Sequence, residues 1–403
     1  MTIAIIGCGS SGSAIGSQIS NEISTDKIKL MDIDGEKSKR LSDDLSKKNK
    51  KTSFESYQLN ANNPKKIVKL LNDVEVVINS ASPFYNIPIM RACIKSKCNY
   101  IDLGSDPFKY EGLEGTSLDD QLPLNDSFSK NELIALTNAG ASPGFSDLLC
   151  KHASETYNFD SLEKVSIYFS EIIESKVFIS SWSPYILLLE SLLPATVYLE
   201  NEIVILPNSK RKKTVNLPPP FGSTQMTLFN GHPELRTIPQ FINIPVSYVE
   251  VGGSLIFNEM NLDDMILESL RRKVTNKLDF EGDIIEGLSS SFEPTNSFVD
   301  LFNLGEIKEE MLFCYTDIVG KAGNDYFKYS ASTKIDIKEI IKKTPFASAT
   351  SYMVSIVPTL LTKKIIEGGI DQRGVLAPAA LDIASEIIKL SEKFDIDLVE
   401  NIN

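Results

Sequence analysis

Histidine, tryptophan and cysteine are scarce in this chain of 403 residues, which has two histidines, one tryptophan and five cysteines. The number of cysteines is odd and none are spaced as C-x-x-C, which argues against a disulfide framework and the usual zinc spacing. Cys93 and Cys98 are the closest pair, and no further metal ligand lies near them in the sequence. We therefore expect a reducing compartment and no metal site.

Excess positive charge and long apolar runs are lacking as well. The formal net charge is -13, which argues against a nucleic acid or an anionic membrane as partner. The longest apolar stretch, residues 186–199, contains Glu190 and is too short to cross a bilayer, so we expect a buried or interface helix there. A core-like strand starts at residue 3, which leaves no room for a signal peptide. These features predict a cytoplasmic protein without nucleic-acid or membrane partners.

The chain begins with an apolar strand that runs into a G-x-G-x-x-G turn at Gly7, Gly9 and Gly12. In a dinucleotide site the first glycine permits the tight turn, the second lets the backbone approach a pyrophosphate, and the third lets helix and strand pack closely. Asp32 follows a second apolar run, twenty residues after Gly12, where its carboxylate can accept hydrogen bonds from ribose hydroxyls. The predicted cofactor contacts here are Gly7, Gly9, Ser10, Ser11, Gly12, Asp32 and Ile33.

The acidic residues after the second strand bear on which dinucleotide binds. An NADP site usually offers a basic side chain to the 2′-phosphate, whereas Asp32 and Asp34 would repel it. Lys37 and Arg40 follow and can reach back. We predict NAD as the cofactor, with NADP as the alternative.

Strand-like and helix-like segments alternate through the first 150 residues. Strands are expected at residues 3–6, 27–31, 73–79, 99–102 and 133–137, and this alternation predicts a doubly wound parallel sheet of the Rossmann type. Further strands are expected at 165–170, 203–206, 246–251 and 311–318, with longer connections that indicate a mixed α+β domain. The sequence predicts an α/β protein with a dinucleotide-binding domain at 1–150, a substrate domain at 151–345 and mostly helical residues at 346–403.

Two strand-end turns should lie near the nicotinamide end of the cofactor, because ligands bind at the carboxyl ends of parallel strands. The first contains Ala81, Ser82, Pro83 and Phe84 and follows what we count as the third strand. The second runs from Gly140 through Pro143 into a helix, whose free N–H groups suit a nicotinamide or a substrate carboxylate. From the residues alone, a structural role of this second turn is equally consistent.

Few side chains are available for proton transfer. His232 lies in a predicted loop two residues before Glu234, which makes a usable acid–base pair. His152 is expected to be packed on a helix. Asp102 ends a predicted strand on the ligand side, and Arg91 and Arg236 are candidates for a substrate carboxylate.

Four segments together resemble the family of saccharopine dehydrogenase (glutamate-forming) and L-lysine 6-dehydrogenase. They are the glycine-rich turn, residues 76–84 with 92–94 and 100–103, residues 140–147, and residues 181–184 with Pro194 and Ala195; residues 374–378 resemble a further landmark. The segments span almost the whole chain. Where family members commonly have Pro-Glu, this chain has Pro378 and Ala379, so the role of that glutamate is in doubt here.

The resemblance implies a function and an assembly. It implies NAD(P)-dependent hydride transfer at a C–N bond of an amino acid or opine-like substrate, through an imine. It also implies that the second domain supplies substrate contacts and the surface of a homodimer, that the terminal helices return to the first domain, and that Trp182 and Ser183 wall the substrate pocket. The candidate catalytic residues are Asp102, His232, Trp182 and Ser183.

Two other classes of protein remain open. A catalytically silent dinucleotide sensor or scaffold would explain the scarce histidine and the missing glutamate. A semialdehyde dehydrogenase-like enzyme would need a nucleophilic cysteine near a histidine, for which Cys150 and His152 are the only nearby pair.

Overall fold

The computed structural model describes residues 1–106, 117–181, 183–219, 221–275, 288–290, 292 and 298–403. The chain forms two compact units, each described here by itself. The first unit comprises Met1–Tyr157, Arg236–Asn243 and Tyr352–Phe394, and the second comprises Asn158–Leu235, Ile244–Ser351 and Asp395–Asn403. Divisions were expected after residues 150 and 345. The units instead divide after Tyr157 and Ser351, and two further short segments change unit.

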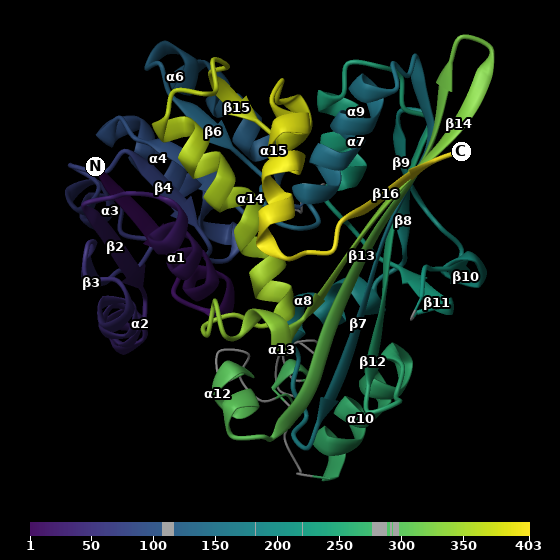
Figure 1. The fold of residues 1–403 in the computed structure, drawn as a ribbon, viewed down its shortest axis with the longest axis horizontal. Coiled ribbons are helices and arrows are strands. Elements are labelled where there is room, and N and C mark those ends of the chain that lie inside the picture. Colours follow the sequence, from purple (N-terminus) through teal and green to yellow (C-terminus); the bar gives the residue numbers. More distant parts are fainter. Residues whose placement is uncertain (107–116, 182, 220, 276–287, 291, 293–297) are drawn as a thin grey trace. The chain divides into compact units, whose positions relative to one another are not determined.

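The first unit is built on a parallel sheet (Figure 1). Its seven strands are β1 (Thr2–Ile6), β2 (Lys27–Asp32), β3 (Ser53–Gln58), β4 (Val76–Asn79), β5 (Asn99–Asp102), β6 (Ile134–Leu136) and β15 (Gly374–Leu376). They follow the order β15-β6-β5-β4-β1-β2-β3, which is the Rossmann order with one added edge strand. β1 is fully buried along its length, as expected for a strand of a parallel sheet with both faces covered. The predicted fold class is confirmed.

Helices connect and cover these strands. They are α1 (Ser10–Glu22), α2 (Gly35–Lys48), α3 (Pro64–Leu70), α4 (Asn86–Ser96), α5 (Leu118–Gln121), α6 (Asn125–Lys130), α7 (Phe145–Thr156) and α15 (Ala384–Ser391), with short 3-10 turns η1 (Pro83–Tyr85), η2 (Leu122–Leu124), η5 (Pro378–Ala380) and η6 (Glu392–Phe394). Two more helices, α9 (Glu234–Phe241) and α14 (Ala349–Ile366), carry residues of both units. α15 contacts α7 within the first unit, so this part of the C-terminal segment does return to the Rossmann sheet.

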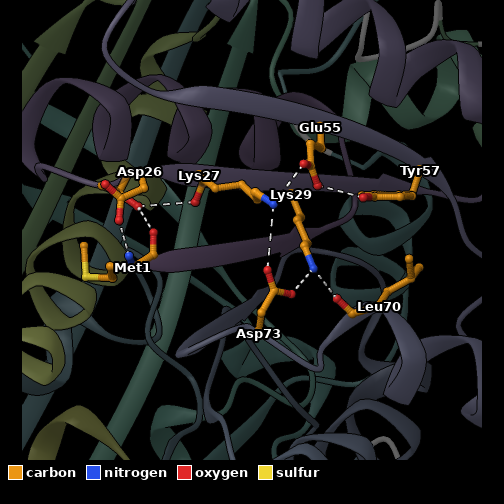
Figure 2. A network of polar contacts seen from close by, with 9 residues as sticks. Met1, Asp26, Lys27, Lys29, Glu55, Tyr57, Leu70 and Asp73 are labelled. Carbon is orange, nitrogen blue, oxygen red and sulfur yellow. Dashed lines mark hydrogen bonds and ion pairs between the residues drawn. The ribbon is translucent and has the colours of Figure 1, made fainter.

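A polar network ties edge strand β3 and the end of α3 to β2 (Figure 2). The Lys29 ammonium donates to the carbonyl oxygen of Leu70 at 2.8 Å and pairs with Asp73. Lys27 lies 2.9 Å from the Glu55 carboxylate, which also accepts a hydrogen bond from the Tyr57 hydroxyl at 2.7 Å. Because Lys27 opens β2 and Asp32 ends it, the network involves the amino half of that strand and leaves its carboxyl end to other contacts.

The strand prediction for the first unit missed β3 and β15. β3 is an edge strand whose residues are all half-buried or exposed, so it lacks the apolar run that marks the inner strands. The strand that ends at Asn79 is therefore the fourth along the chain and not the third. It nevertheless pairs directly with β1, which places the turn after it beside the glycine-rich turn.

The second unit is built on a mixed sheet. Its nine strands in the described residues are β7 (Ser161–Ser175), β8 (Thr196–Leu199), β9 (Glu202–Ile205), β10 (Lys212–Asn216), β11 (Ser223–Leu228), β12 (Tyr248–Phe257), β13 (Ile307–Ala322), β14 (Asp325–Asp336) and β16 (Val399–Ile402). The path runs β10-β11-β12-β7-β13-β14-β16, with β8 pairing β12 and β9. β12 pairs β7 in parallel and the other pairs are antiparallel. Among the described residues, the helices of this unit include α8 (Pro184–Leu192), α10 (Leu262–Thr275), α12 (Phe298–Asn303), α13 (Ile337–Ile340) and η3 (Asn208–Lys210).

One sequence expectation for this part of the chain is wrong. The apolar stretch 186–199 is not one helix, because α8 ends at Leu192 and β8 begins at Thr196, with helix-breaking Pro194 between them. The C-terminal segment, expected to be mostly helical, contains α14 and α15 and ends in strand β16, which adds to the sheet beside β14. Among the described residues, no helix combines the length and apolar character needed to cross a membrane.

A buried acid lies on one face of this sheet. Glu250 on β12 is 2% exposed, accepts hydrogen bonds from the hydroxyls of Ser166 and Tyr168, and pairs with the Lys213 ammonium at 2.5 Å. Burial alone would raise the pKa of Glu250, but the bonds from Lys213, Tyr168 and Ser166 outweigh it and lower the pKa to about 2. This cluster joins hairpin strand β10 to β7 and β12.

Candidate cofactor and active site

The glycine-rich turn after β1 leaves no room for side chains at two of its three glycines. Gly7 has φ +98°, and a Cβ there would lie 2.7 Å from the Ala81 amide nitrogen. A Cβ on Gly12 would lie 1.9 Å from the carbonyl oxygen of Gly7. By contrast, no described atom lies within 4 Å of a Cβ built on Gly9. The backbone thus requires Gly7 and Gly12, while Gly9 faces open space into which a pyrophosphate fits.

The helix that follows this turn presents its N-terminus toward the same space. α1 begins at Ser10 with Gly9 as its N-cap, no described side chain caps it, and its first turn contains no acidic residue. Ser10 and Ser11 are half-buried. An N-terminus with unused N–H groups and a positive dipole end attracts phosphate.

Asp32 borders the turn from the end of β2. Its Oδ2 accepts a hydrogen bond from the Cys8 N–H at 2.7 Å, and its Oδ1 accepts one from the Asp34 N–H at 2.9 Å. Asp34 in turn accepts a hydrogen bond from the Glu36 N–H and caps α2. The Asp32 carboxylate is therefore held beside the glycine-rich turn, as a ribose contact requires.

Two exposed apolar side chains flank this turn. Ile33 is 62% exposed and follows β2, and Phe84 is 45% exposed and lies in η1 after β4. Among the described residues of the first unit, these are the only large apolar side chains with such exposure. Because β2 and β4 lie on the two sides of β1, the pair offers apolar contacts at two ends of one site, which suits the two ring systems of a dinucleotide.

The turn after β4 is bonded to the glycine-rich turn. The Ser80 hydroxyl donates to the carbonyl oxygen of Gly7 at 2.6 Å, and the Ala81 N–H donates to the Asn79 side chain at 3.1 Å. Ala81, Ser82 and Pro83 are half-buried. The four residues predicted here as cofactor contacts, Ala81 to Phe84, thus lie in one short segment next to β1.

The turn between β6 and α7 differs from the expectation. Gly140 and Pro143 are buried, and a Cβ on Gly140 would lie 3.0 Å from the carbonyl oxygen of Leu103. The N–H groups of Gly144, Phe145 and Ser146 donate to Asp147, to the Gly140 carbonyl and to the Ala141 carbonyl. The prediction that this helix offers free N–H groups is therefore wrong for these three, because the turn itself uses them.

Asp102, the last residue of β5, is 1% exposed. Its carboxylate accepts hydrogen bonds from the Asn138 N–H at 2.8 Å and from the Gln121 side chain at 2.6 Å. Burial raises the pKa of Asp102 to about 7 despite these bonds. Both carboxylate oxygens accept hydrogen bonds from protein donors, which disfavours a direct contact between Asp102 and a substrate.

His232, in the second unit, is 3% exposed. Its Nδ1 bonds to the Glu234 carboxylate, and its ring lies 6.2 Å from the ring of Phe169 and 6.4 Å from that of Phe229. The predicted His–Glu pair thus exists, in apolar surroundings that strengthen it.

The other predicted substrate residues have more ordinary surroundings. Ser183 is exposed and its Oγ lies 3.5 Å from the Ile186 nitrogen at the start of α8. Trp182 lies outside the described residues. Arg236 pairs with Asp119 at 2.8 Å, and Arg91 is exposed on α4. No grouping of three or more His, Cys, Asp or Glu side chains suited to a metal ion occurs in the described part of the chain.

Cys150 and His152 do not form a nucleophile–base pair suited to a semialdehyde dehydrogenase. Cys150 is 0% exposed on α7, whereas a nucleophile must reach its substrate. The Nδ1 of His152 bonds to the Ser385 hydroxyl at 2.8 Å and to the Thr156 hydroxyl at 3.2 Å, as expected for a packed helix histidine.

A pair of buried glutamates was not predicted. Glu171 on β7 accepts hydrogen bonds from Ser181 and Thr350, and Glu310 on β13 accepts them from the N–H groups that begin α14. Burial, and for Glu310 also the charge of Glu171, raises the pKa of both carboxyls. The sequence carries little signal for this pair: Glu171 stands beside the apolar residues Ile172 and Ile173, and Glu310 follows Lys308 and Glu309.

Comparisons with known proteins agree with this geometry. Residues 3–136 match the family model described as saccharopine dehydrogenase NADP binding domain. A carboxynorspermidine synthase of Vibrio cholerae is 30% identical over 124 residues, which cover 30% of this chain and 30% of that protein. The chain thus matches under a third of the length of this curated relative.

Two solved structures share the fold over the whole chain. Saccharopine dehydrogenase (L-Glu forming) from Saccharomyces cerevisiae has a TM-score of 0.68 at 14% identity, covering 100% of this chain and 99% of that one. Homospermidine synthase from Legionella pneumophila, solved in complex with NAD, has a TM-score of 0.69 at 17% identity, covering 100% and 91%. At these identities the likeness shows the fold. The resemblance noted in the sequence and the predicted NAD(P) cofactor class are confirmed over residues 3–136, the region that matches the saccharopine dehydrogenase NADP binding domain.

Proposed function

We propose that this chain is an NAD(P)-dependent oxidoreductase that transfers hydride at a C–N bond of an amino acid or opine-like substrate, through an imine. The observation that carries the proposal is the glycine-rich turn with open space at Gly9, bordered by the Asp32 carboxylate at 2.7 Å from the Cys8 amide. This cradle fits a dinucleotide, whose nicotinamide ring supplies the hydride chemistry when bound.

The names of the similar proteins support a substrate class. Saccharopine, homospermidine and carboxynorspermidine each contain a secondary amine, the group that results when an imine is reduced. We therefore assign this chain an amine or amino-acid substrate, with saccharopine, lysine and polyamine precursors as the compounds to test.

The protein residues have separate proposed tasks. Gly7 to Gly12 and Asp32 hold the pyrophosphate and ribose, and Ile33 and Phe84 contact the two rings. His232, bonded to Glu234, accepts a proton from the amine or from the water that hydrolyses the imine. Ser183, with Trp182, contacts substrate, and the chain acts as a homodimer.

We further propose that NAD is preferred over NADP. Asp32 and Asp34 place two carboxylates where a 2′-phosphate would lie. The nearest basic side chains on α2 are Lys37, which is exposed, and Arg40, which lies 4.0 Å from Asp44. Both acids accept hydrogen bonds from backbone N–H groups, which hold them in place.

The decisive experiment is a titration of the purified protein with NADH and NADPH, followed by cofactor fluorescence. We expect NADH to bind at least tenfold more tightly than NADPH. Asp32→Ala should weaken NADH binding at least tenfold, whereas Asp43→Ala, which changes an exposed acid on the following helix α2, should not. Equal binding of NADH by the Asp32 variant would refute the ribose contact.

Turnover is then measured with a panel of amino acids and of oxo-acid and amine pairs, by absorbance of the reduced cofactor. Turnover that oxidises or forms a secondary amine would support the proposed enzymatic activity. Tight NADH binding with no turnover by any pair would instead support a dinucleotide sensor.

A further inference from the structure

Asp102 connects two loops at the carboxyl edge of the first unit's sheet. Its Oδ1 accepts the Asn138 N–H at 2.8 Å, and its main-chain oxygen accepts the Ala139 N–H at 2.8 Å. Asn138 has φ +60°, a left-handed conformation that asparagine tolerates but that needs support from its surroundings. One residue of β5 therefore fixes the first two amides of the turn that continues to Gly144.

Asn138 extends the connection to the loop after β5. Its Oδ1 accepts hydrogen bonds from the N–H of Ser105 at 2.7 Å and from the Ser105 hydroxyl at 2.9 Å. Both residues are buried. Because that oxygen takes two donors, the orientation of the Asn138 amide is determined, and the two strand-end loops are held together by it.

Gln121 completes the arrangement on the other side of the carboxyl. Its Nε2 donates to Asp102 Oδ2 at 2.6 Å, while its own Oε1 is buried and has no hydrogen-bond partner among the described residues. Leaving a buried acceptor unpaired is costly. If the carboxyl of Asp102 carries a proton, rotation of the Gln121 amide by half a turn gives that proton an acceptor, so the pair can accommodate both charge states.

No cation neutralises this carboxyl in the described part of the chain. The other titratable group facing it is the Tyr100 hydroxyl on the same strand; Gln121 from α5, Asn138 after β6 and the Gly104 backbone present neutral donors. The pKa of about 7 places the change of charge within the physiological range.

We propose that Asp102 is a positioning residue of the dehydrogenase reaction, which holds the 138–144 turn through Asn138 and does so most firmly when its buried carboxyl is protonated and Gln121 accepts that proton. This inference rests on the proposed function, because it assigns the turn to the nicotinamide end of the cofactor site. A buried carboxylate without a neighbouring cation is costly, so ionisation of Asp102 favours opening of the turn that covers it. The turn is therefore best ordered, and the cofactor best bound, below neutral pH.

The test compares NADH affinity of the wild type and of Asp102→Asn between pH 5.5 and 8.5. Asparagine keeps an acceptor for the Asn138 N–H and cannot ionise, so it mimics the protonated acid. We expect equal dissociation constants at pH 5.5 and, at pH 8.5, about fivefold weaker binding by the wild type than by the variant. Asp126→Asn, which changes an exposed acid on α6, should follow the wild-type curve. An Asp102→Asn curve parallel to that of the wild type overturns the proposal.

A second measurement needs no cofactor and separates this proposal from the proposed function. Hydrogen exchange of the peptide containing residues 138–144 is followed in the free protein at both pH values, corrected for intrinsic exchange. We expect protection to fall about fivefold from pH 5.5 to 8.5 in the wild type and to stay constant in Asp102→Asn. If the protection in the wild type does not change with pH, the positioning role is contradicted, whether or not the protein binds NADH. Absence of NADH binding with the expected exchange pattern would instead refute only the proposed function.

Discussion

The Ser80 hydroxyl donates to the carbonyl oxygen of Gly7 at 2.6 Å, which joins the turn after β4 to the turn after β1. The same carbonyl lies 1.9 Å from the position of a Cβ on Gly12. Three segments of backbone therefore meet around one peptide group, and the space for ligand lies on the side of Gly9.

This arrangement predicts different effects of two alanine substitutions. Gly12→Ala forces backbone apart and should destabilise the first unit by about 2 kcal/mol or more, with loss of NADH binding. Gly9→Ala meets no described atom and should keep its melting temperature within about 2 °C while NADH affinity falls at least tenfold. Thermal unfolding and NADH fluorescence measure the two quantities. An unchanged affinity of Gly9→Ala would mean that phosphate does not approach this turn.

Ile33 and Phe84 should act on different parts of the cofactor. Both are exposed, so serine at either position should change stability by less than about 0.5 kcal/mol. We expect Ile33→Ser to weaken the binding of both NADH and ADP-ribose about fivefold, because both ligands contain the adenosine. Phe84→Ser should weaken the binding of NADH and leave that of ADP-ribose unchanged. Leu304→Ser, which changes an exposed apolar residue of the second unit, is the matched control. If Phe84→Ser weakens ADP-ribose as much as NADH, its assignment to the nicotinamide end is incorrect.

The two histidines make a matched pair for testing proton transfer. His232→Gln should lower kcat about 100-fold with unchanged NADH affinity, because it removes the proposed acid–base group. His152→Gln changes a helix histidine bonded to Ser385 and should leave kcat within about twofold. Steady-state kinetics with the substrate found in the panel measure both. Equal kcat values for the two variants would exclude His232 from catalysis.

Glu250 should make the second unit sensitive to acid. Its pKa falls from 4.5 in the unfolded chain to about 2 in the folded one, so the ionised form contributes stability that is fully present above pH 4.5. That contribution is lost as the pH falls toward 2, and its size at neutral pH is about 3 kcal/mol. Urea unfolding should therefore show wild type more stable than Glu250→Gln at pH 7, with the difference shrinking between pH 4.5 and 2.5. A difference independent of pH would contradict the ion pair with Lys213 as its cause.

Glu310 should show the opposite dependence on pH. Burial and the neighbouring Glu171 raise its pKa above 4.5, so the folded state holds a proton that the unfolded chain releases. The stability associated with that proton is present below pH 4.5 and is lost as the pH rises through the folded-state pKa. Glu310→Gln, which cannot ionise, should lose less stability than the wild type between pH 5 and 8. Parallel melting curves of the two proteins over this range would show that Glu310 is ionised when folded.

Local sequence patterns predicted the first unit best where strands are buried and close in sequence. β1, β2 and β4 contain apolar runs, and β1 and β4 are followed by glycine or small residues; the apolar runs result from burial between helices. The turn at Gly7 was predictable for the same reason, since only glycine satisfies its backbone. β3 escaped prediction because an edge strand in contact with solvent has polar residues on it.

Contacts between distant segments were not predictable from local patterns. The occupied N–H groups of α7 depend on Asp147, and the environment of Asp102 depends on Gln121 and Asn138. Likewise Glu171 and Glu310 meet only because β7 pairs with β13. Periodicity carries no information on such pairings, whereas they decide which of the candidate residues is buried and which is exposed.

The Rossmann sheet is completed late in the chain. Its outermost strand, β15, pairs with β6, and the Thr137 hydroxyl bonds to the Leu376 carbonyl across a separation of 239 residues. During synthesis from the N-terminus, the edge of β6 therefore waits unpaired while the second unit up to Ser351 emerges from the ribosome. An open strand edge is a template for aggregation, so the nascent first unit needs protection until β15 has been made.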